Sequence, residues 1–361
     1  MRLWSVVLLA FLLAGQIACR PPAAATSSAP APPGAQSPSA TTPAAAGSGS
    51  APAAPPPRVS MRLGLNAVSA SIAPIWLAKD EGIFEKYGFD VELITLQSSS
   101  QVAKVMASGE IPVAVSAAAG VVDAALAGDD QVLLSGFQNT MNFWVYSRPE
   151  IVAVPDLRGK SLAVTRIGSG IYLGATDMLR KAGLEPDRDV ALRQIGGTAE
   201  VYGSLVAGAV DAAVVAIPYN FEAQDAGYHL LYDLSAQKIP YLQNGLASSK
   251  SYVKNNEDVV RRLMMAHIEG LARVHKDKAT TIEVLSRNLK NDDRQLMSRT
   301  YDLIEPLFER IPYPAAASIQ TVIDQRAEEN PAARSLTPAQ VSDDHFVRDL
   351  ETQGFVGQVY N

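Results

Sequence analysis

The same local pattern occurs twice in the chain: a predicted helix ends at a glycine, the chain turns within two residues, and an apolar strand follows. Residues 106–115 and 205–214 both follow this plan, with Gly109 and Gly208 at the turns. In each half of the chain this unit closes a longer run that alternates strands with helices. Such alternation places consecutive strands parallel, through right-handed crossovers. We therefore predict an α/β protein built from two units of similar plan, each around a parallel sheet.

The strands of these two units are expected where apolar residues are continuous or alternate with polar ones. They cover residues 61–65, 89–96, 111–115, 161–165, 190–195 and 210–216. Proline or hydroxyl residues start the helices between them, and glycines end those helices.

The composition is typical of a globular domain and unlike that of a nucleic-acid-binding protein. Of the 361 residues, 47% are hydrophobic and 19% are charged, with a formal net charge of −6. Nucleic-acid-binding domains usually carry a basic excess instead. The stretch from Arg58 onward is long enough for two lobes rather than one.

The only cysteine, Cys19, follows a short apolar run that opens with Arg2. A charged start and an apolar stretch too short to span a bilayer are typical of an export signal. Residues 16–19 resemble the cleavage box of a bacterial lipoprotein, although Gln16 departs from that pattern. We predict a lipoprotein signal peptide over residues 1–19, with lipid on Cys19. The alternative is an ordinary secretory signal cut near residues 23–25, which would discard this cysteine.

The next segment, residues 20–58, consists almost entirely of Pro, Ala, Ser, Thr and Gly. Such a segment buries too little apolar surface to offset the entropy lost on ordering, so we expect a disordered tether. The tether would connect a lipid anchor in the bacterial membrane to a domain facing the periplasm or the cell exterior.

Four segments follow one another along the folded part in a recognisable order. They read AKDEGIFEKYGFDVE at 78–92, DLRGKSLAV at 156–164, AGLEPDRDV at 182–190 and GAVDAA at 208–213, followed by Ile217-Pro218. Together they resemble the nitrate/sulfonate/taurine family of ABC-transporter solute-binding proteins, which includes thiamine-precursor-binding members. The resemblance extends from residue 59 to about residue 354.

This resemblance implies a type II periplasmic-binding-protein fold, in which two α/β lobes are joined by two crossing strands. Lobe 1 would comprise residues 59–142 and 245–361, and lobe 2 residues 143–244. The implied function is an exported receptor that delivers a small-molecule solute to an ABC permease and its ATPase. We expect a monomer that needs no cofactor.

In open parallel sheets, ligands bind beyond the carboxyl ends of the strands, where backbone N–H groups and helix N-termini face outward. This rule selects loops of small, hydroxylated or glycine residues, which also occur where no ligand binds. The predicted ligand-binding residues are Ser69, Ser71, Ser98, Ser99, Ser116, Ala117, Gly168, Ser169, Gly170, Thr198, Pro218 and Tyr219. Arg166 could pair with an anionic solute and Glu200 with an amine, so the sign of the solute stays open.

Signals for catalysis are weak. Ser251 and Lys254 match the Ser-x-x-Lys pattern, but the elements that accompany it in known enzymes are missing. The four histidines show no metal-ligand spacing. We predict that the protein is not an enzyme and holds no metal. The alternatives are an enzyme on the same fold, of the kind that forms thiamine pyrimidine, or a receptor that serves a sensor.

Overall fold

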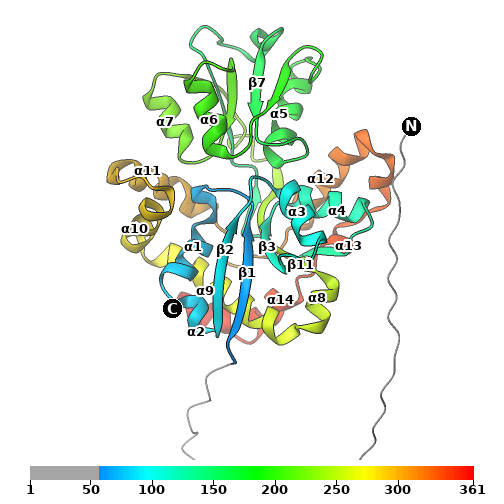
Figure 1. The fold of residues 1–361 in the computed structure, drawn as a ribbon, viewed down its shortest axis with the longest axis vertical. Helices are drawn as coiled ribbons and strands as arrows, with labels where there is room; N and C mark the ends of the chain where they lie inside the picture. The colour runs from blue at the N-terminus through cyan, green and yellow to red at the C-terminus, as the bar shows by residue number, and fades with distance from the viewer. Residues whose placement is uncertain (1–56) are drawn as a thin grey trace, which may run out of the picture. The chain divides into compact units, whose positions relative to one another are not determined.

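A computed structural model describes residues 57–361 of this chain. The predicted signal peptide, its Cys19 and the tether up to residue 56 lie outside the described residues. The described part contains two mixed sheets, each covered by helices (Figure 1).

The first sheet has the strand order β2-β1-β3-β11-β4, and β5 pairs with β11. The strands are β1 (Val59–Leu65), β2 (Phe89–Thr95), β3 (Val113–Ser116), β4 (Gln131–Leu133), β5 (Gln138–Thr140) and β11 (Pro240–Ser249). β1 is parallel to both β2 and β3, as the strand–helix alternation predicts. β11 enters between β3 and β4 and is antiparallel to both, which makes the sheet mixed rather than wholly parallel.

The second sheet has the order β10-β6-β9-β7-β8. Its strands are β6 (Trp144–Ser147), β7 (Ser161–Val164), β8 (Ala191–Gln194), β9 (Ala212–Val215) and β10 (His229–Asp233). β7 is parallel to β8 and β9, whereas β6 is antiparallel to β9 and β10. The expectation of a parallel sheet therefore holds only for the strands joined by helical crossovers, because the strand that enters this sheet runs the other way.

Helices of the two α/β units cover the sheets. In the first unit they are α1 (Ala73–Asp80), α2 (Ile83–Lys86), α3 (Ser99–Ala107) and α4 (Ala118–Leu126), with a 3-10 turn η1 at Ala70–Ile72. In the second they are η2 (Val154–Leu157), α5 (Gly170–Lys181), α6 (Thr198–Val206) and α7 (Tyr219–Asp225). We call the first sheet with its helices lobe 1 and the second sheet with its helices lobe 2.

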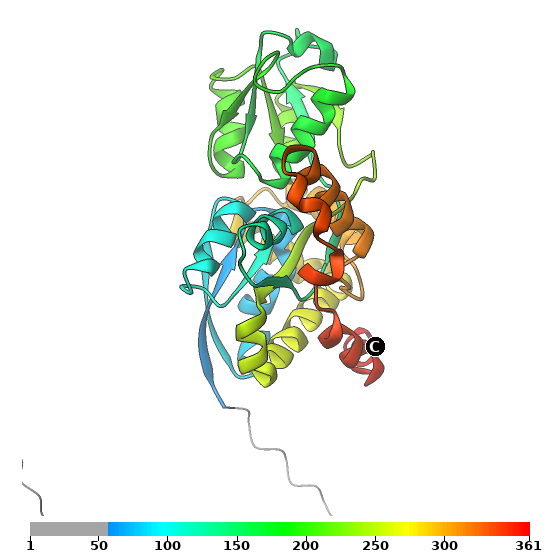
Figure 2. The same cartoon turned by 90° about the vertical axis from the view of Figure 1, so that its right-hand side faces the viewer.

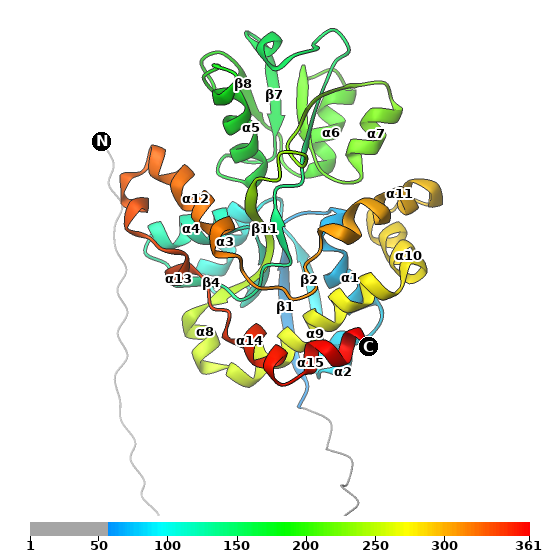
Figure 3. The same ribbon diagram turned by 180° about the vertical axis from the view of Figure 1, so that it is seen from behind.

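The chain crosses between the lobes twice, from β5 to β6 and from β10 to β11, as Figure 3 shows from behind. β11 is the longer connection, and it carries the buried Tyr241 and Leu242. It pairs with β5 at Asn244↔Gln138, so it belongs to the first sheet along its length. The lobe boundary predicted at residues 244/245 falls inside β11. The lobe boundaries drawn from the sequence remain a prediction.

The C-terminal third is helical and packs mainly on lobe 1. It contains α8 (Lys250–Asn255), α9 (Glu257–Lys276), α10 (Lys278–Leu289), α11 (Arg294–Ile304), η3 (Glu305–Leu307), α12 (Ala316–Glu329), η4 (Pro331–Ser335), α13 (Pro338–Val341), α14 (His345–Thr352) and α15 (Phe355–Tyr360). α9 approaches α1 closely at Gly270, where a Cβ would lie 2.5 Å from the Pro74 carbonyl oxygen. Figure 2 shows α12 in orange beside the junction of the lobes. Within residues 57–361, no helix is both long enough and apolar enough to cross a bilayer.

Candidate functional site

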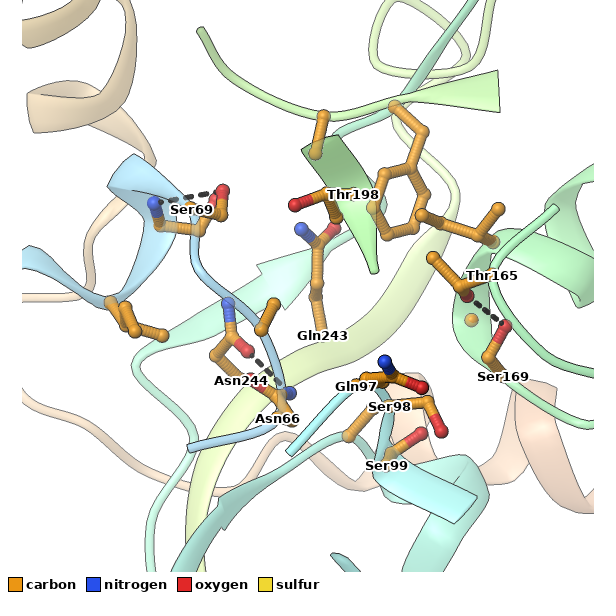
Figure 4. Close-up of a pocket in the computed structure, with 18 of the residues that line it drawn as sticks. Asn66, Ser69, Gln97, Ser98, Ser99, Thr165, Ser169, Thr198, Gln243 and Asn244 are labelled. Carbon is orange, nitrogen blue, oxygen red and sulfur yellow. Dashed lines mark hydrogen bonds between the residues drawn. The ribbon is translucent and has the colours of Figure 1, made fainter. Parts of the chain in front are cut away.

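A cavity of about 60 Å³ lies between the lobes and is lined by residues from both (Figure 4). Its walls come mainly from loops that follow β1, β2, β3, β7 and β9, together with β11. The lining residues are Asn66, Ala67, Ser69, Ser71, Ile72, Gln97, Ser98, Ser99, Ala117, Phe143, Thr165, Ser169, Gly170, Ile171, Thr198, Ala216, Tyr241, Gln243 and Asn244. One water-sized group needs roughly 10–15 Å³ of cavity volume, so the cavity has room for a small solute of a few heavy atoms.

The structure brings eight of the twelve residues selected from the sequence to this cavity. They are Ser69, Ser71, Ser98, Ser99, Ala117, Ser169, Gly170 and Thr198. These residues stand at carboxyl ends of strands or at the helix starts that follow, which is where the rule for open α/β sheets places ligands.

The other four selected residues do not line the cavity. Ser116 is fully buried, and its hydroxyl donates to the Ala117 carbonyl. Gly168 lies at a separate surface hollow, and its carbonyl accepts from Arg326 at 2.8 Å. Pro218 follows a cis peptide bond, and Tyr219 stacks on Tyr202 with ring centroids 5.4 Å apart.

Four helices begin at the cavity wall, at Ser99, Ala118, Gly170 and Thr198. Two of them have serine caps: the Ser98 hydroxyl accepts from Gln101 N, and the Ser169 hydroxyl accepts from Tyr172 N. α4 and α6 instead follow Ala117 and Gly197 and have no side-chain cap. The first N–H groups of a helix have no intrahelical partner, so α4 and α6 leave donors free to bind a ligand.

Three buried polar atoms of the lining have no hydrogen-bond partner among the described residues. They are the Asn66 Oδ1, the Ser71 Oγ and the Tyr241 hydroxyl. Burial raises the pKa of Tyr241, so it remains a neutral phenol at physiological pH. Buried polar groups normally find partners, and these three atoms are therefore candidates for contact with a solute.

Among the described residues, no Asp, Glu, Lys, Arg or His lines the cavity. Arg166 lies beside it and donates to the Gln97 Oε1, which bridges the two lobes. Glu200 is exposed on the first turn of α6 and does not reach the lining either. The cavity wall is thus polar but formally uncharged, and helix N-termini are its strongest electrostatic feature.

The sequence patterns missed the amide residues of the site. Gln243 and Asn244 lie on β11, a strand that returns from lobe 2. Asn66 Nδ2 donates to Asn244 Oδ1 at 2.9 Å, and Asn244 Nδ2 donates to Gln138 Oε1 at 2.7 Å (Figure 4 shows the first bond). Two adjacent amides within a stretch of mostly small and apolar residues were the available signal, since buried amides need partners.

The groups considered for catalysis lie elsewhere. His267 is buried in lobe 1 against Phe137, and burial lowers its pKa to about 3. Ser251 and Lys254 lie on α8, outside the cavity lining. Across residues 57–361, no cluster of three His, Cys, Asp or Glu side chains is arranged to hold a metal ion.

The structure is similar to several solved structures at low sequence identity. A protein from Bordetella bronchiseptica RB50 matches with a TM-score of 0.74 and 16% identity over 81% of this chain and 97% of that chain. The alkanesulfonate-binding protein SsuA from Xanthomonas axonopodis pv. citri, bound to MOPS, matches with a TM-score of 0.67 and 18% identity over 80% and 99%. The periplasmic nitrate-binding protein NrtA from Synechocystis PCC 6803 matches with a TM-score of 0.70 and 14% identity over 84% and 91%.

These likenesses confirm the predicted fold, that of the periplasmic binding proteins, with two α/β lobes joined by two crossing strands. No curated protein matches the sequence. A family model described as NMT1/THI5 like matches residues 69–280, more than half of the 361-residue chain. The chain therefore belongs to the NMT1/THI5-like family.

Proposed function

We propose that this protein is the extracytoplasmic solute-binding receptor of an ABC importer. It captures a small solute between its lobes and delivers it to a membrane permease and its ATPase. The observation that carries this proposal is the cavity that both lobes line with hydroxyls, amides and helix N-termini. Its support from relatives is the shared fold of proteins named for binding alkanesulfonate and nitrate.

We infer that the solute is an anion, such as an alkanesulfonate or nitrate. Each helix N-terminus stabilises a nearby anion by about 0.3–1 kcal/mol, and by up to ~2 kcal/mol where it is partly buried. α4 and α6 offer backbone donors that no side chain caps. The Ser71 and Tyr241 hydroxyls add donors that no other described residue uses. These donors would replace the water that an anion loses on burial.

Solute binding would shift the equilibrium between open and closed lobes toward the closed state. A solute that contacts both walls at once binds only when the lobes are together, so it favours the closed state. The direct contacts we propose come from the predicted residues that line the cavity, above all Ser71, Ser99, Ala117 and Gly170. Asn66 and Tyr241 join them from outside the original prediction.

We propose that the receptor binds its solute without turnover. Among the described residues, the cavity lining offers no carboxylate, imidazole or amine to act as a general acid or base. The only cysteine of the chain is Cys19, near its N-terminus, so the domain itself carries no thiol nucleophile.

The experiment is a thermal-shift screen of the purified protein against alkanesulfonates, nitrate, bicarbonate, pyrimidines, flavins and aromatic acids. A solute at about a hundred times its Kd should add ~2.7 kcal/mol to the free energy of unfolding. Each stabilising solute is then recovered and checked for chemical change. Stabilisation by an anion that is recovered intact supports the proposal, whereas chemical conversion favours the enzyme. If no solute stabilises the protein, the receptor function is wrong.

We further propose that lipid on Cys19 holds the receptor at the bacterial membrane through the tether of residues 20–58, and that the receptor is a monomer. Bacterial lipidation adds more than one acyl chain, which is what stable anchoring requires. Cys19→Ser should move the protein from the membrane fraction to the soluble fraction. Unchanged membrane retention of this variant would contradict lipidation at Cys19.

A further inference from the structure

Three hydrogen bonds join the lobes beside the cavity, around residues 68–70 of lobe 1. The Ser69 Oγ donates to the Ile217 carbonyl of lobe 2 at 3.0 Å, and Ala70 N donates to the same oxygen at 3.3 Å. In the opposite direction, the Thr198 Oγ1 of lobe 2 donates to the Val68 carbonyl of lobe 1 at 2.9 Å. Lobe 1 thus supplies two donors and one acceptor, and lobe 2 supplies one donor and one acceptor. We call these five residues the inter-lobe clasp.

The two clasp hydroxyls are buried, with exposed fractions of 3% for Ser69 and 6% for Thr198. Both stand on the cavity wall, on opposite lobes (Figure 4). A hydroxyl has a single proton to donate, and each of these protons is committed to a carbonyl of the other lobe. Neither group therefore has a proton left for an oxygen of the solute.

Ser71 behaves differently although it lies only two residues from Ser69. Its Oγ is buried and has no partner among the described residues. Its backbone N–H donates to the Ser69 Oγ at 3.3 Å, which helps to orient the clasp hydroxyl toward Ile217. One short loop therefore contains both a hydroxyl bound to the opposite lobe and a hydroxyl available to a solute.

We propose that Ser69 and Thr198 are positioning residues that set the balance between open and closed lobes, while Ser71 takes part in selecting the solute. This inference rests on the proposed receptor function for its link to affinity. Since donor and acceptor lie on different lobes, an opening motion about the crossing strands separates them. Loss of a clasp bond therefore lowers the closed fraction, and the apparent Kd rises by the same factor for every solute.

Other inter-lobe contacts involve charged side chains: Arg166 donates to the Gln97 Oε1, and Arg326 donates to the Gly168 carbonyl at 2.8 Å. Two more are exposed ion pairs. Arg299 of α11 pairs with Asp225 of α7 at 2.8 Å on the surface, and Arg180 of α5 pairs with Glu329 of α12 at 3.1 Å. Salt screens such exposed pairs, whereas the clasp joins buried neutral groups. Any effect of the clasp on closure should therefore be nearly independent of ionic strength.

The test uses Ser69→Ala and Thr198→Val, which remove the hydroxyls with little change in size. The matched controls are Ser204→Ala and Thr321→Val, whose hydroxyls donate to carbonyls of their own helices, Val201 at 2.7 Å and Ala317 at 3.1 Å. Spin labels at Ser108→Cys and Lys181→Cys, both exposed and on different lobes, report the inter-lobe distance in a Cys19→Ser background. Calorimetry gives the Kd for each solute found in the screen.

We expect each clasp variant to increase the long-distance population without solute and to raise Kd by about two- to tenfold, equally for all solutes. The two controls should change neither quantity. Ser71→Ala should alter the order of affinities among solutes instead. A Kd change that differs between solutes for Ser69→Ala or Thr198→Val would overturn the proposal, as would an unchanged distance distribution. If no solute binds even the unmodified protein, the receptor function fails, while the distance measurement still decides the clasp.

Discussion

Removing the Tyr241 hydroxyl should have opposite effects on stability and on solute binding. Tyr241 is fully buried on β11, lines the cavity, and its hydroxyl has no hydrogen-bond partner among the described residues. Tyr241→Phe therefore breaks no bond within the described protein. An unpaired buried hydroxyl costs about 1–3 kcal/mol, so the free energy of unfolding without solute should stay unchanged or rise by up to that amount.

The effect on binding should be unfavourable. Burial raises the pKa of Tyr241, so the phenol keeps its proton and is available to donate to an acidic solute. A hydrogen bond to a charged group contributes about 1.5–3 kcal/mol. The Kd of Tyr241→Phe for an anionic solute should therefore rise by roughly ten- to a hundredfold.

Gly170 packs against the Tyr241 hydroxyl, so a substitution there tests the same group through stability rather than through binding. A Cβ on Gly170 would lie 2.6 Å from the Tyr241 hydroxyl oxygen and 3.0 Å from two ring carbons. Gly170→Ala should thus destabilise the protein by about 1–3 kcal/mol through overpacking. Combining it with Tyr241→Phe removes the shortest of these contacts, so the double variant should lose less stability than the two single effects predict.

The assays are chemical denaturation without solute and calorimetric titration with the best solute from the screen. Tyr301→Phe is the matched control, because its buried hydroxyl donates to the Val274 carbonyl at 3.0 Å, away from the cavity. That control should lose about 0.5–1.5 kcal/mol of stability and keep its affinity. The reasoning is wrong if Tyr241→Phe binds as tightly as the unmodified protein, or if it loses stability as Tyr301→Phe does.

Two further predictions concern acid sensitivity and helix capping. Burial lowers the pKa of His267 to about 3, so below its ordinary value of 6.5 the unfolded state takes up a proton that the folded state does not. The contribution of His267 to the free energy of unfolding should fall by about 1.4 kcal/mol per pH unit below pH 6.5, or ~2 kcal/mol by pH 5, and His267→Gln should lose less stability over this range in urea denaturation. Ala117→Ser would supply the missing cap of α4, so it should stabilise the protein by about 0.5–2 kcal/mol in denaturation without solute. The same variant should weaken anion binding in calorimetry, because the serine oxygen competes with the anion for the helix N–H groups; tighter binding would contradict a role for α4 at the site.

Local pattern predicted much of the fold. The expected strand at 161–165 is β7 (Ser161–Val164), and that at 89–96 is β2 (Phe89–Thr95). Such agreement arises because alternation of apolar residues and helix capping act over a few neighbouring residues. Local pattern could not predict the antiparallel placement of β11, because its partners β3 and β4 lie more than a hundred residues earlier in the chain.

The residues of the candidate site likewise fall into those that local pattern predicted and those that it missed. Ser71 and Ser99 were selected because small hydroxyl residues follow strands there, and both line the cavity. Tyr241 and Gln243 were missed because β11 brings them to the cavity from another part of the chain. Pro218 was selected for its place after a strand, but in that loop Ala216 lines the cavity and Pro218 does not.

By itself the sequence determined that this protein has alternating strands and helices, an uncharged set of small residues at the strand ends, and a single cysteine far from them. Those properties depend on residue type and short-range spacing. Only the tertiary structure decided which hydroxyls face a solute and which join the lobes. Ser69 and Ser71 are the same residue type two positions apart, yet one bonds to Ile217 and the other has no partner among the described residues. The physical reason is that a hydroxyl acts through the partner it meets, and that partner lies 148 positions away in the sequence.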